Sequence, residues 1–428
     1  MPTPVPPRTY RATLSGVAVN AFGNGLMTPY VISWLAALPH GSTRVAGILF
    51  GATGAGQLIA TLYAGRLLTL VPPRKVLAGA LSLSALAALL LTLAGSLPAA
   101  AVLLFLLGSA QGIASAAQAA VLGSLTLAGG REDRVWSHLQ VVLNLGQGLG
   151  FLAGGYMVTG NLADTMRPVF LVNAATFALF AAVVYVVLPR HSPAAPGTRE
   201  DATGSYREVL RQPHPRRLLI ADGIYFTFGI GFLLLLPLLA SEAKLLSLRQ
   251  VAVLLAANTV IIICLQLPVS RVAGRLNRPT AVRIFFLGAS AAWLLLVVGL
   301  QLGSRTAALI IAWAAVFLFS LTECLHTACL VPQLPEAVSE TNRPRILALH
   351  VFASKTGLIA GPALGGVLMG YGVEWAWVSA ACLLTVPALF PPGRRPATAS
   401  KHPSGAAAPV SDESVSSPAR RAPSSSGE

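Results

Sequence analysis

Long apolar stretches recur along the whole chain and constrain its fold more than any other feature. A helix of about 20 apolar residues spans a hydrocarbon core of roughly 30 Å. Only helices and closed barrels satisfy their own backbone polar groups in that environment. The chain therefore predicts an all-α integral membrane protein. Its twelve expected transmembrane helices cover residues 14–38, 45–68, 76–96, 98–125, 135–158, 168–189, 217–240, 248–273, 280–302, 306–331, 346–371 and 375–390.

The composition agrees with this class and gives the orientation. Of the 428 residues, 54% are hydrophobic and only 11% are charged, although the net charge is +15. Soluble proteins carry about 25% charged residues. When alternate connections are grouped, 24 of the 30 Lys and Arg residues lie on one side of the membrane. The positive-inside rule then predicts a multi-pass protein of the inner or plasma membrane with both termini cytoplasmic, and the charge does not indicate nucleic-acid binding.

The connection 190–216 is the longest and most polar, and it divides the chain into two sets of six spans. We expect an N-terminal bundle over 14–189 and a C-terminal bundle over 217–390. Residues 1–13 form a short cytoplasmic tail, and the Ser- and Pro-rich residues 391–428 are predicted to be a disordered cytoplasmic tail.

A glycine pattern repeats in the fifth and eleventh spans. The two copies have identical spacing at an offset of 211 residues: Gly146, Gly150, Gly154 and Gly155, then Gly357, Gly361, Gly365 and Gly366. A single small-x-x-x-small motif is common in membrane helices and indicates only close packing. Two matched copies indicate a duplication of six spans, which gives both halves the same orientation.

These motifs resemble the major facilitator superfamily over roughly residues 10–392. The segment Gly357–Gly366, with Pro362 after Gly361, is similar to the antiporter motif of that family, which lies in the fifth span. In the fifth span of this chain Phe151 occupies the proline position. The first span, Asn20 to Pro29, also resembles bacterial drug-efflux members. The resemblance implies the twelve-helix family fold and favours efflux.

Two further motifs of the family are present in altered form. Gly65 and the basic pair Arg74 and Lys75 resemble the gating loop, but Thr69 replaces its acidic residue. The fourth span keeps Gln111-Gly112, whereas Gly108 replaces an arginine that the family links to proton movement. These departures put the charge relay of the gate and the role of that arginine in doubt.

Three ionisable residues lie inside predicted spans, where a charge is costly and indicates a function or a partner. They are Asp222, Glu323 and Lys355. We expect Glu323 to be the acid that couples protons to transport. A structural ion pair between Glu323 and Lys355, or a contact of Glu323 with a cationic substrate, is the alternative. Asp222 is either a second coupling acid or an interfacial residue near Arg216 and Arg217.

Polar side chains at helical spacing predict a central cavity, because lipid-facing amides are expensive. Interhelical hydrogen bonding is the alternative explanation. By the resemblance, the first, fourth, seventh and tenth spans line the cavity. The candidate cavity residues are Asn20, Asn24, Gln111, Ser115, Gln140, Asn144, Tyr225 and His326, and Gln118 and Gln147 continue the polar stripes of the fourth and fifth spans.

The sequence thus predicts a secondary transporter that exports a hydrophobic small molecule in exchange for protons. An uptake symporter for a small nutrient and a transport-inactive, receptor-like membrane protein are the alternatives. The chain contains no phosphate-binding loop, nucleophile elbow or metal-ligand spacing, so we expect no enzyme activity, cofactor or metal. The expected partners are a small molecule, protons and the lipid bilayer, with the chain acting as a monomer.

Overall fold

The computed structural model describes residues 7–127, 132–158, 162–188 and 205–391. Within these ranges every regular element is a helix, which confirms the all-α class. By length and hydropathy, eight helices of the described residues can cross a membrane, or nine if one bent pair counts as a single span. Residues 1–6 of the expected N-terminal tail lie outside the described residues, but residues 7–13 belong to the first helix, so that helix begins earlier than predicted. Most of the central connection and residues 392–428 of the expected C-terminal tail also lie outside the described residues, so the domain boundaries stay predictions.

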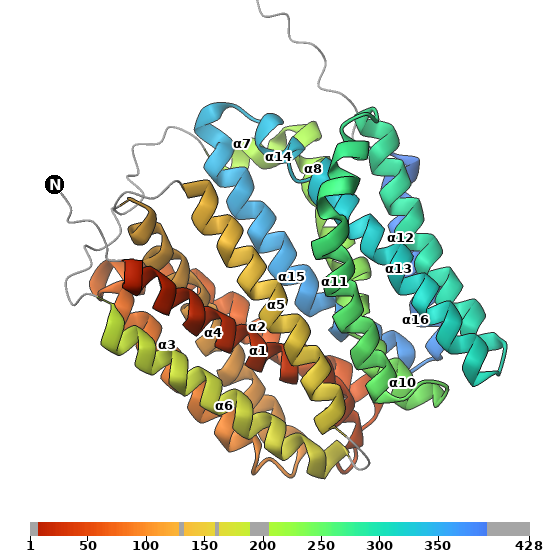
Figure 1. Cartoon of the computed structure of the whole chain (residues 1–428), viewed down its shortest axis with the longest axis horizontal. Helices are drawn as coiled ribbons and strands as arrows, with labels where there is room; N and C mark the ends of the chain where they lie inside the picture. Colours follow the sequence, from red (N-terminus) through yellow and green to blue (C-terminus); the bar gives the residue numbers. More distant parts are fainter. Residues whose placement is uncertain (1–6, 128–131, 159–161, 189–204, 392–428) are drawn as a thin grey trace, which may run out of the picture. The chain divides into compact units, whose positions relative to one another are not determined.

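The first half of the described chain contains six long helices, drawn red to yellow in Figure 1. Each of them overlaps one of the first six predicted spans. They are α1 (Pro7–Ala37), α2 (Thr43–Leu70), α3 (Pro73–Leu91), α4 (Leu97–Leu127), α5 (Glu132–Met157) and α6 (Leu162–Val187).

The second half repeats this order, drawn green to blue, after the short helix α7 (Tyr206–Arg211). Its first span is divided into α8 (Pro213–Ile224), the π-helix η1 (Tyr225–Ile230), α9 (Gly231–Leu233) and α10 (Leu236–Ala243). The others are α11 (Leu248–Ala273), α12 (Arg278–Gln301), α13 (Arg305–Cys329), α15 (Arg343–Met369) and α16 (Val373–Leu389). The short α14 (Gln333–Glu336) and η2 (Glu340–Asn342) precede α15.

Hydroxyl and amide side chains fix where several helices begin. The Ser42 hydroxyl accepts a hydrogen bond from the Val45 amide at the start of α2. Ser247 and Gln250 form a reciprocal capping box at the start of α11, and Asn277 caps α12. Such caps satisfy amide groups that have no partner inside the helix. The chain can therefore turn at these points without leaving donors unpaired.

Helix pairing in the second half copies that in the first. In the first half α1 packs on α5, α2 on α4, and α3 on both α4 and α6. The corresponding contacts are those of η1 and α8 with α15, of α11 with α13, and of α12 with α13 and α16. This correspondence is the arrangement that the glycine offset predicts.

The repeated glycines are the points of closest approach between helices. A Cβ atom on Gly150 would lie 2.2 Å from the Phe22 carbonyl oxygen of α1. In the second half, a Cβ on Gly361 would lie 2.3 Å from the Thr227 carbonyl oxygen of η1. No real side chain tolerates such distances, so each motif holds the fifth helix of its half against the first.

The seventh span is bent where a proline interrupts it. The segments Pro213–Leu233 and Leu236–Ala243 meet at an angle of 48°. Pro237 has no amide hydrogen, and its ring clashes with the carbonyl four residues earlier, that of Leu233. Just before the bend, Trp293 of α12 donates its indole hydrogen to the Phe228 carbonyl in η1, at 2.8 Å. The irregular backbone is thus supported from a neighbouring helix.

Replacing Gly361 by Ala should destabilise the protein by about 1–3 kcal/mol, because the added methyl group overlaps a backbone oxygen. The matched control is Gly79→Ala in α3, where a Cβ would meet nothing within 4 Å. That variant should keep or slightly raise stability, since Ala is the better helix former. The measurement is the thermal unfolding midpoint of purified protein in detergent. Equal midpoints for the two variants would contradict the packing role of Gly361.

Candidate functional site

A cavity of about 400 Å³ lies between the two halves. Its volume falls within the usual range for small-molecule sites, about 300–1,000 Å³. The first half contributes only uncharged side chains, whereas the second contributes Glu323 and Lys355. The polar lining consists of Asn24, Thr28, Thr53, Gln57, Gln111, Asn144, Gln147, Asn258, Thr259, Glu323 and Lys355, and most of the remaining lining is aliphatic or aromatic.

The cavity is sealed at the end of the bundle where α2 begins and α15 ends, here called the sealed end. There Gly47 and Gly366 bring the two helices into backbone contact. The Thr43 hydroxyl donates to the Glu242 carboxylate of α10 at 2.5 Å. These contacts join the first half to the second and close one route into the cavity.

The same two helices separate toward the other end, where α2 ends and α3 begins, here called the basic end. Gly65 lies 18 residues after Gly47, which is about five helical turns and therefore the same face of α2. A Cβ on Gly65 would meet nothing within 4 Å, whereas one on Gly54 would clash with Ile359 of α15. The structure thus holds the halves together at the sealed end and apart at the basic end.

The gating-loop residues make contacts within the first half. Arg74 is buried at the start of α3, and its guanidinium donates to the Tyr185 carbonyl of α6. The guanidinium also lies 5.1 Å from the centre of the Tyr185 ring. Lys75 is exposed. In this arrangement Arg74 therefore ties α3 to α6, and Gly65 has no neighbour in the second half.

Glu323 of α13 and Lys355 of α15 both line the cavity without forming an ion pair. Among the described residues, no carboxylate oxygen lies within 4.0 Å of the Lys355 ammonium. The amide of Asn258 donates to Glu323 Oε2 at 3.3 Å and to Ser320 Oγ at 2.9 Å. The alternative of a structural Glu323–Lys355 pair is not realised here, so both charges remain available to a bound molecule.

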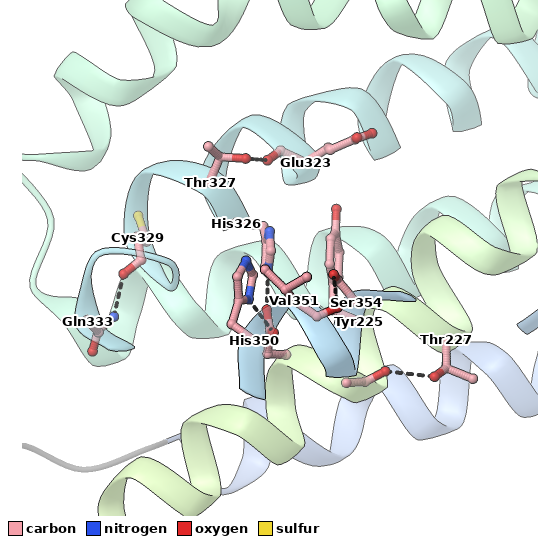
Figure 2. Close-up of polar contacts among 12 residues, drawn as sticks. Tyr225, Thr227, Glu323, His326, Thr327, Cys329, Gln333, His350, Val351 and Ser354 are labelled. Atoms are coloured by element: carbon pink, nitrogen blue, oxygen red, sulfur yellow. Dashed lines mark hydrogen bonds and ion pairs between the residues drawn. The ribbon is translucent and has the colours of Figure 1, made fainter. Parts of the chain in front are cut away.

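Asp222 lies elsewhere, at a buried junction of three helices. Its Oδ1 is 2.8 Å from His326 Nε2 of α13, and its Oδ2 is 2.7 Å from His350 Nδ1 of α15. Figure 2 shows both imidazoles converging on this point. We call Asp222, His326 and His350 the Asp–His cluster. Asp222 has no exposed surface, and its partners are the two histidines rather than the nearby Arg216 and Arg217.

Aromatic rings surround the cluster. Tyr225 stacks on His326 with ring centres 4.4 Å apart. Phe226 meets His326 and His350 edge-on, at 5.4 and 5.9 Å. Phe226 also lines the cavity, whereas none of the three cluster residues does. One aromatic ring thus lies between the cluster and the cavity.

The expected position of His326 and Tyr225 in the cavity is corrected by this geometry. Both are buried outside it. Glu323 and His326 are one turn apart, but α13 lies between α11 and α8, so Glu323 meets Asn258 while His326 meets Asp222. Helical spacing correctly places Glu323 and His326 on one side of α13. It does not show that the two side chains contact different neighbouring helices.

Only some of the uncharged candidate residues line the cavity. Asn24, Gln111, Asn144 and Gln147 line the cavity, and the Gln111 amide donates to Asn24 Oδ1 at 3.4 Å. Asn20 and Ser115 do not line it. The side chain of Gln140 lies outside the described part of the structure.

Sequence reasoning did not single out His350 as a site residue. The available signal was its place in the same predicted span as Lys355. Within the described residues, no group of three or more His, Cys, Asp and Glu side chains has the geometry of a metal site. In the Asp–His cluster the two imidazoles bind different carboxylate oxygens.

Comparison with known proteins identifies the fold family. A family model described as the Major Facilitator Superfamily matches residues 13–321 and 224–423. The chain belongs to the Major Facilitator Superfamily. No curated protein sequence matches it significantly.

Solved structures of superfamily transporters share the fold at low sequence identity. A D-xylose-proton symporter has 16% identity and a TM-score of 0.70, covering 90% of this chain and 96% of its own. A mutant form of the nucleoside transporter NupG has 12% identity and a TM-score of 0.69, covering 89% and 98%. A bacterial homologue of the human lysosomal transporter Spinster, in an inward-facing and unoccupied conformation, has 12% identity and a TM-score of 0.67, covering 90% and 94%. The chain is therefore a multi-pass membrane protein with the twelve-helix fold of secondary transporters.

A cysteine at Gln111 should react with a membrane-impermeant maleimide added from the basic end, and only slowly with reagent added from the sealed end. The physical reason is that α2 and α15 separate toward the basic end only. The background lacks the native cysteines Cys264, Cys324, Cys329 and Cys382. A cysteine at Ala110, the preceding residue, which is 0% exposed, is the control and should label poorly from both ends. Equal labelling of the Gln111 position from both ends would contradict a one-sided cavity.

Proposed function

We propose that this protein is a proton-coupled secondary transporter that moves a small molecule through its cavity by alternating access, with Glu323 as the coupling acid. The observation that carries the proposal is that Glu323 is the one carboxyl side chain of the described residues that lines the cavity. A coupling acid must meet both the solute and water, and it must change exposure when the halves move. Asp222, held by two histidines behind Phe226, meets neither condition in this arrangement.

The cavity lining suits an amphipathic solute. Apolar side chains such as Met27, Phe151 and Leu358 alternate with amides such as Asn24 and Gln111. Apolar contact supplies most of the affinity in such sites, and a few polar groups fix the orientation. We propose a molecule with an apolar body and one or more hydrogen-bonding groups, rather than a purely hydrophobic one.

The two cavity charges give a mechanism for coupling. With Glu323 ionised and Lys355 protonated, the cavity is neutral overall and offers a strong hydrogen-bond acceptor to a solute. A proton on Glu323 removes that acceptor, so proton and solute exclude one another. Mutual exclusion at one site is the requirement for exchange of a proton against a solute, which supports export driven by protons entering the cell.

The resemblance of Gly357–Gly366 to the antiporter motif also favours export, although its glycines serve helix packing in this structure. Uptake is the second candidate function, supported by the amide-rich lining. The similar solved structures include a nucleoside transporter and a xylose symporter. In a symporter the proton on Glu323 would promote solute binding instead of opposing it.

We also propose that the basic end faces the cytoplasm. Basic side chains gather in the connections at this end, and such connections are retained on the cytoplasmic side. The cavity would then open inward in the arrangement described. The protein would act as a monomer in the inner or plasma membrane, where anionic headgroups attract its basic residues.

Glu323→Gln should abolish solute transport driven by a pH gradient and leave folding intact, because Gln keeps the size and the acceptor for Asn258 but carries no exchangeable charge. The assay uses proteoliposomes with an imposed pH gradient and a panel of amphipathic compounds and small nutrients. The control is Glu336→Gln, a surface acid paired with Arg278 at 2.5 Å, which should transport normally. Full gradient-driven transport by the Glu323 variant would refute its coupling role.

The sign of proton exchange separates export from uptake. If proton and solute exclude one another, adding a transported solute to purified protein in weak buffer releases protons, and solute affinity rises with pH. Proton uptake on binding would instead establish symport. If no compound of the panel moved a proton or crossed the vesicle membrane, the transport-inactive alternative would be favoured. A pH-sensitive dye in the solution detects either proton release or proton uptake.

A further inference from the structure

The Asp–His cluster is a group of titratable side chains that the transport proposal does not use. Its three members come from three helices of the second half, α8, α13 and α15. The side chains of Asp222 and His326 are 0% and 3% exposed, whereas His350 is 18% exposed. The cluster is therefore almost dry, and His350 is its one contact with the surroundings.

Charge balance decides how many protons such a cluster holds. A buried carboxylate without a compensating charge is strongly disfavoured. Two neutral imidazoles would satisfy both oxygens with hydrogen bonds but leave a net charge of −1. Two imidazolium groups would leave +1. One additional proton on the pair makes the cluster neutral while keeping both hydrogen bonds.

Among the described residues, the two histidines are the only groups within ion-pair distance of Asp222 and the only side chains that bond to it. Glu323 and Lys355 face the cavity, and the Tyr225 hydroxyl lies 3.5 Å from Thr322. The remaining titratable groups on the elements at this end of α8 and α15 are Tyr206, Arg207, Glu208, Arg211, His214, Arg216, Arg217, Cys329, Glu336, Glu340, Arg343 and Arg345.

We propose that Asp222, His326 and His350 form a second proton-binding site, separate from the solute cavity, in which the two imidazoles share one proton and the carboxylate balances its charge. The bound proton joins α15 to α8 and α13. When it leaves, the net negative charge is relieved if α15 moves away and water enters beside His350. Proton occupancy therefore favours the arrangement described here, with α15 docked on α8.

The position of the cluster links this site to the transport cycle. Asp222 lies in the last turns of α8, directly before the π-helix η1, and π-helical turns are frequent at functional sites. Phe226 of η1 contacts both imidazoles and lines the cavity. A change in the cluster can thus reach the cavity wall through a single residue. This link rests on the proposed function, whereas the proton site itself does not.

The proton site is tested by solid-state NMR of the full chain in lipid bilayers, with ¹⁵N-labelled histidine at pH 7. The chain has seven histidines, so the cluster signals are assigned by their loss in His326→Gln and His350→Gln. We expect one imidazolium in the cluster of the wild type. Two neutral imidazoles, or two charged ones, would overturn the proposal.

Three variants show whether the proton is shared. Asp222→Asn makes the carboxyl position neutral, so both histidines should be neutral. His350→Gln keeps a hydrogen-bond donor at the more exposed position, so His326 should then carry the proton, and the reverse holds for His326→Gln. If the imidazolium disappears in one histidine variant and persists in the other, the proton belongs to one residue and the proposal is wrong. The two histidine variants decide the point even if Asp222→Asn does not fold.

The conformational role is tested with spin labels at Tyr63→Cys and Val351→Cys, on α2 and α15 toward the basic end, in the cysteine-free background. Distance distributions are measured at pH 6 and pH 8.5 without solute. The wild type should change its distribution with pH, Asp222→Asn should lose most of this change, and the surface control Glu336→Gln should behave like the wild type. If the pH response persists in Asp222→Asn and is lost in Glu323→Gln, the cavity acid controls the movement and the role of the cluster is refuted. Full transport by Glu323→Gln, which would refute the proposed function, would leave this result unaffected.

Discussion

Close backbone contact at glycine is the interaction on which the rest of this structure depends. Lipid tails are as apolar as Leu side chains, so helices in a membrane gain little by hiding apolar surface from one another. Packing distance then decides which helices pair. Gly150 and Gly361 let the fifth helix of each half lie directly against the first. The equivalent pairing of the first and fifth helices in the two halves follows from this repeated motif.

The last glycine of each motif turns toward the opposite half. Gly155 of α5 contacts Ala252 of α11, and Gly366 of α15 contacts Gly47 of α2. These contacts seal one end of the bundle and let the helices separate toward the other. The cavity therefore lies on one side of the contacts that the last glycine of each motif makes. The glycine motifs that pack each half also form the interface about which the halves can move.

Ionisable groups within the spans are divided between two environments by one helix. α13 carries Glu323 on the side of the cavity and His326 on the side of α8. Glu323 stays in contact with a space that a solute can enter, whereas Asp222 is enclosed by imidazoles and aromatic rings. In the proposed mechanism this separation lets Glu323 respond to both solute and protons, and the Asp–His cluster to protons alone, within a single half of the molecule.

The sequence by itself determined the helical class, the order and approximate bounds of the twelve spans, and the duplicated glycine motifs, because each depends on local length, hydropathy and spacing. It also identified Glu323, Lys355 and Asp222, because a charge in an apolar run is conspicuous. Only the tertiary structure decided that Glu323 and Lys355 stand apart in the cavity and that Asp222 meets His350. Residues 128 positions apart are brought together by helix packing, and no local pattern in the chain records which face of a helix will meet which neighbour.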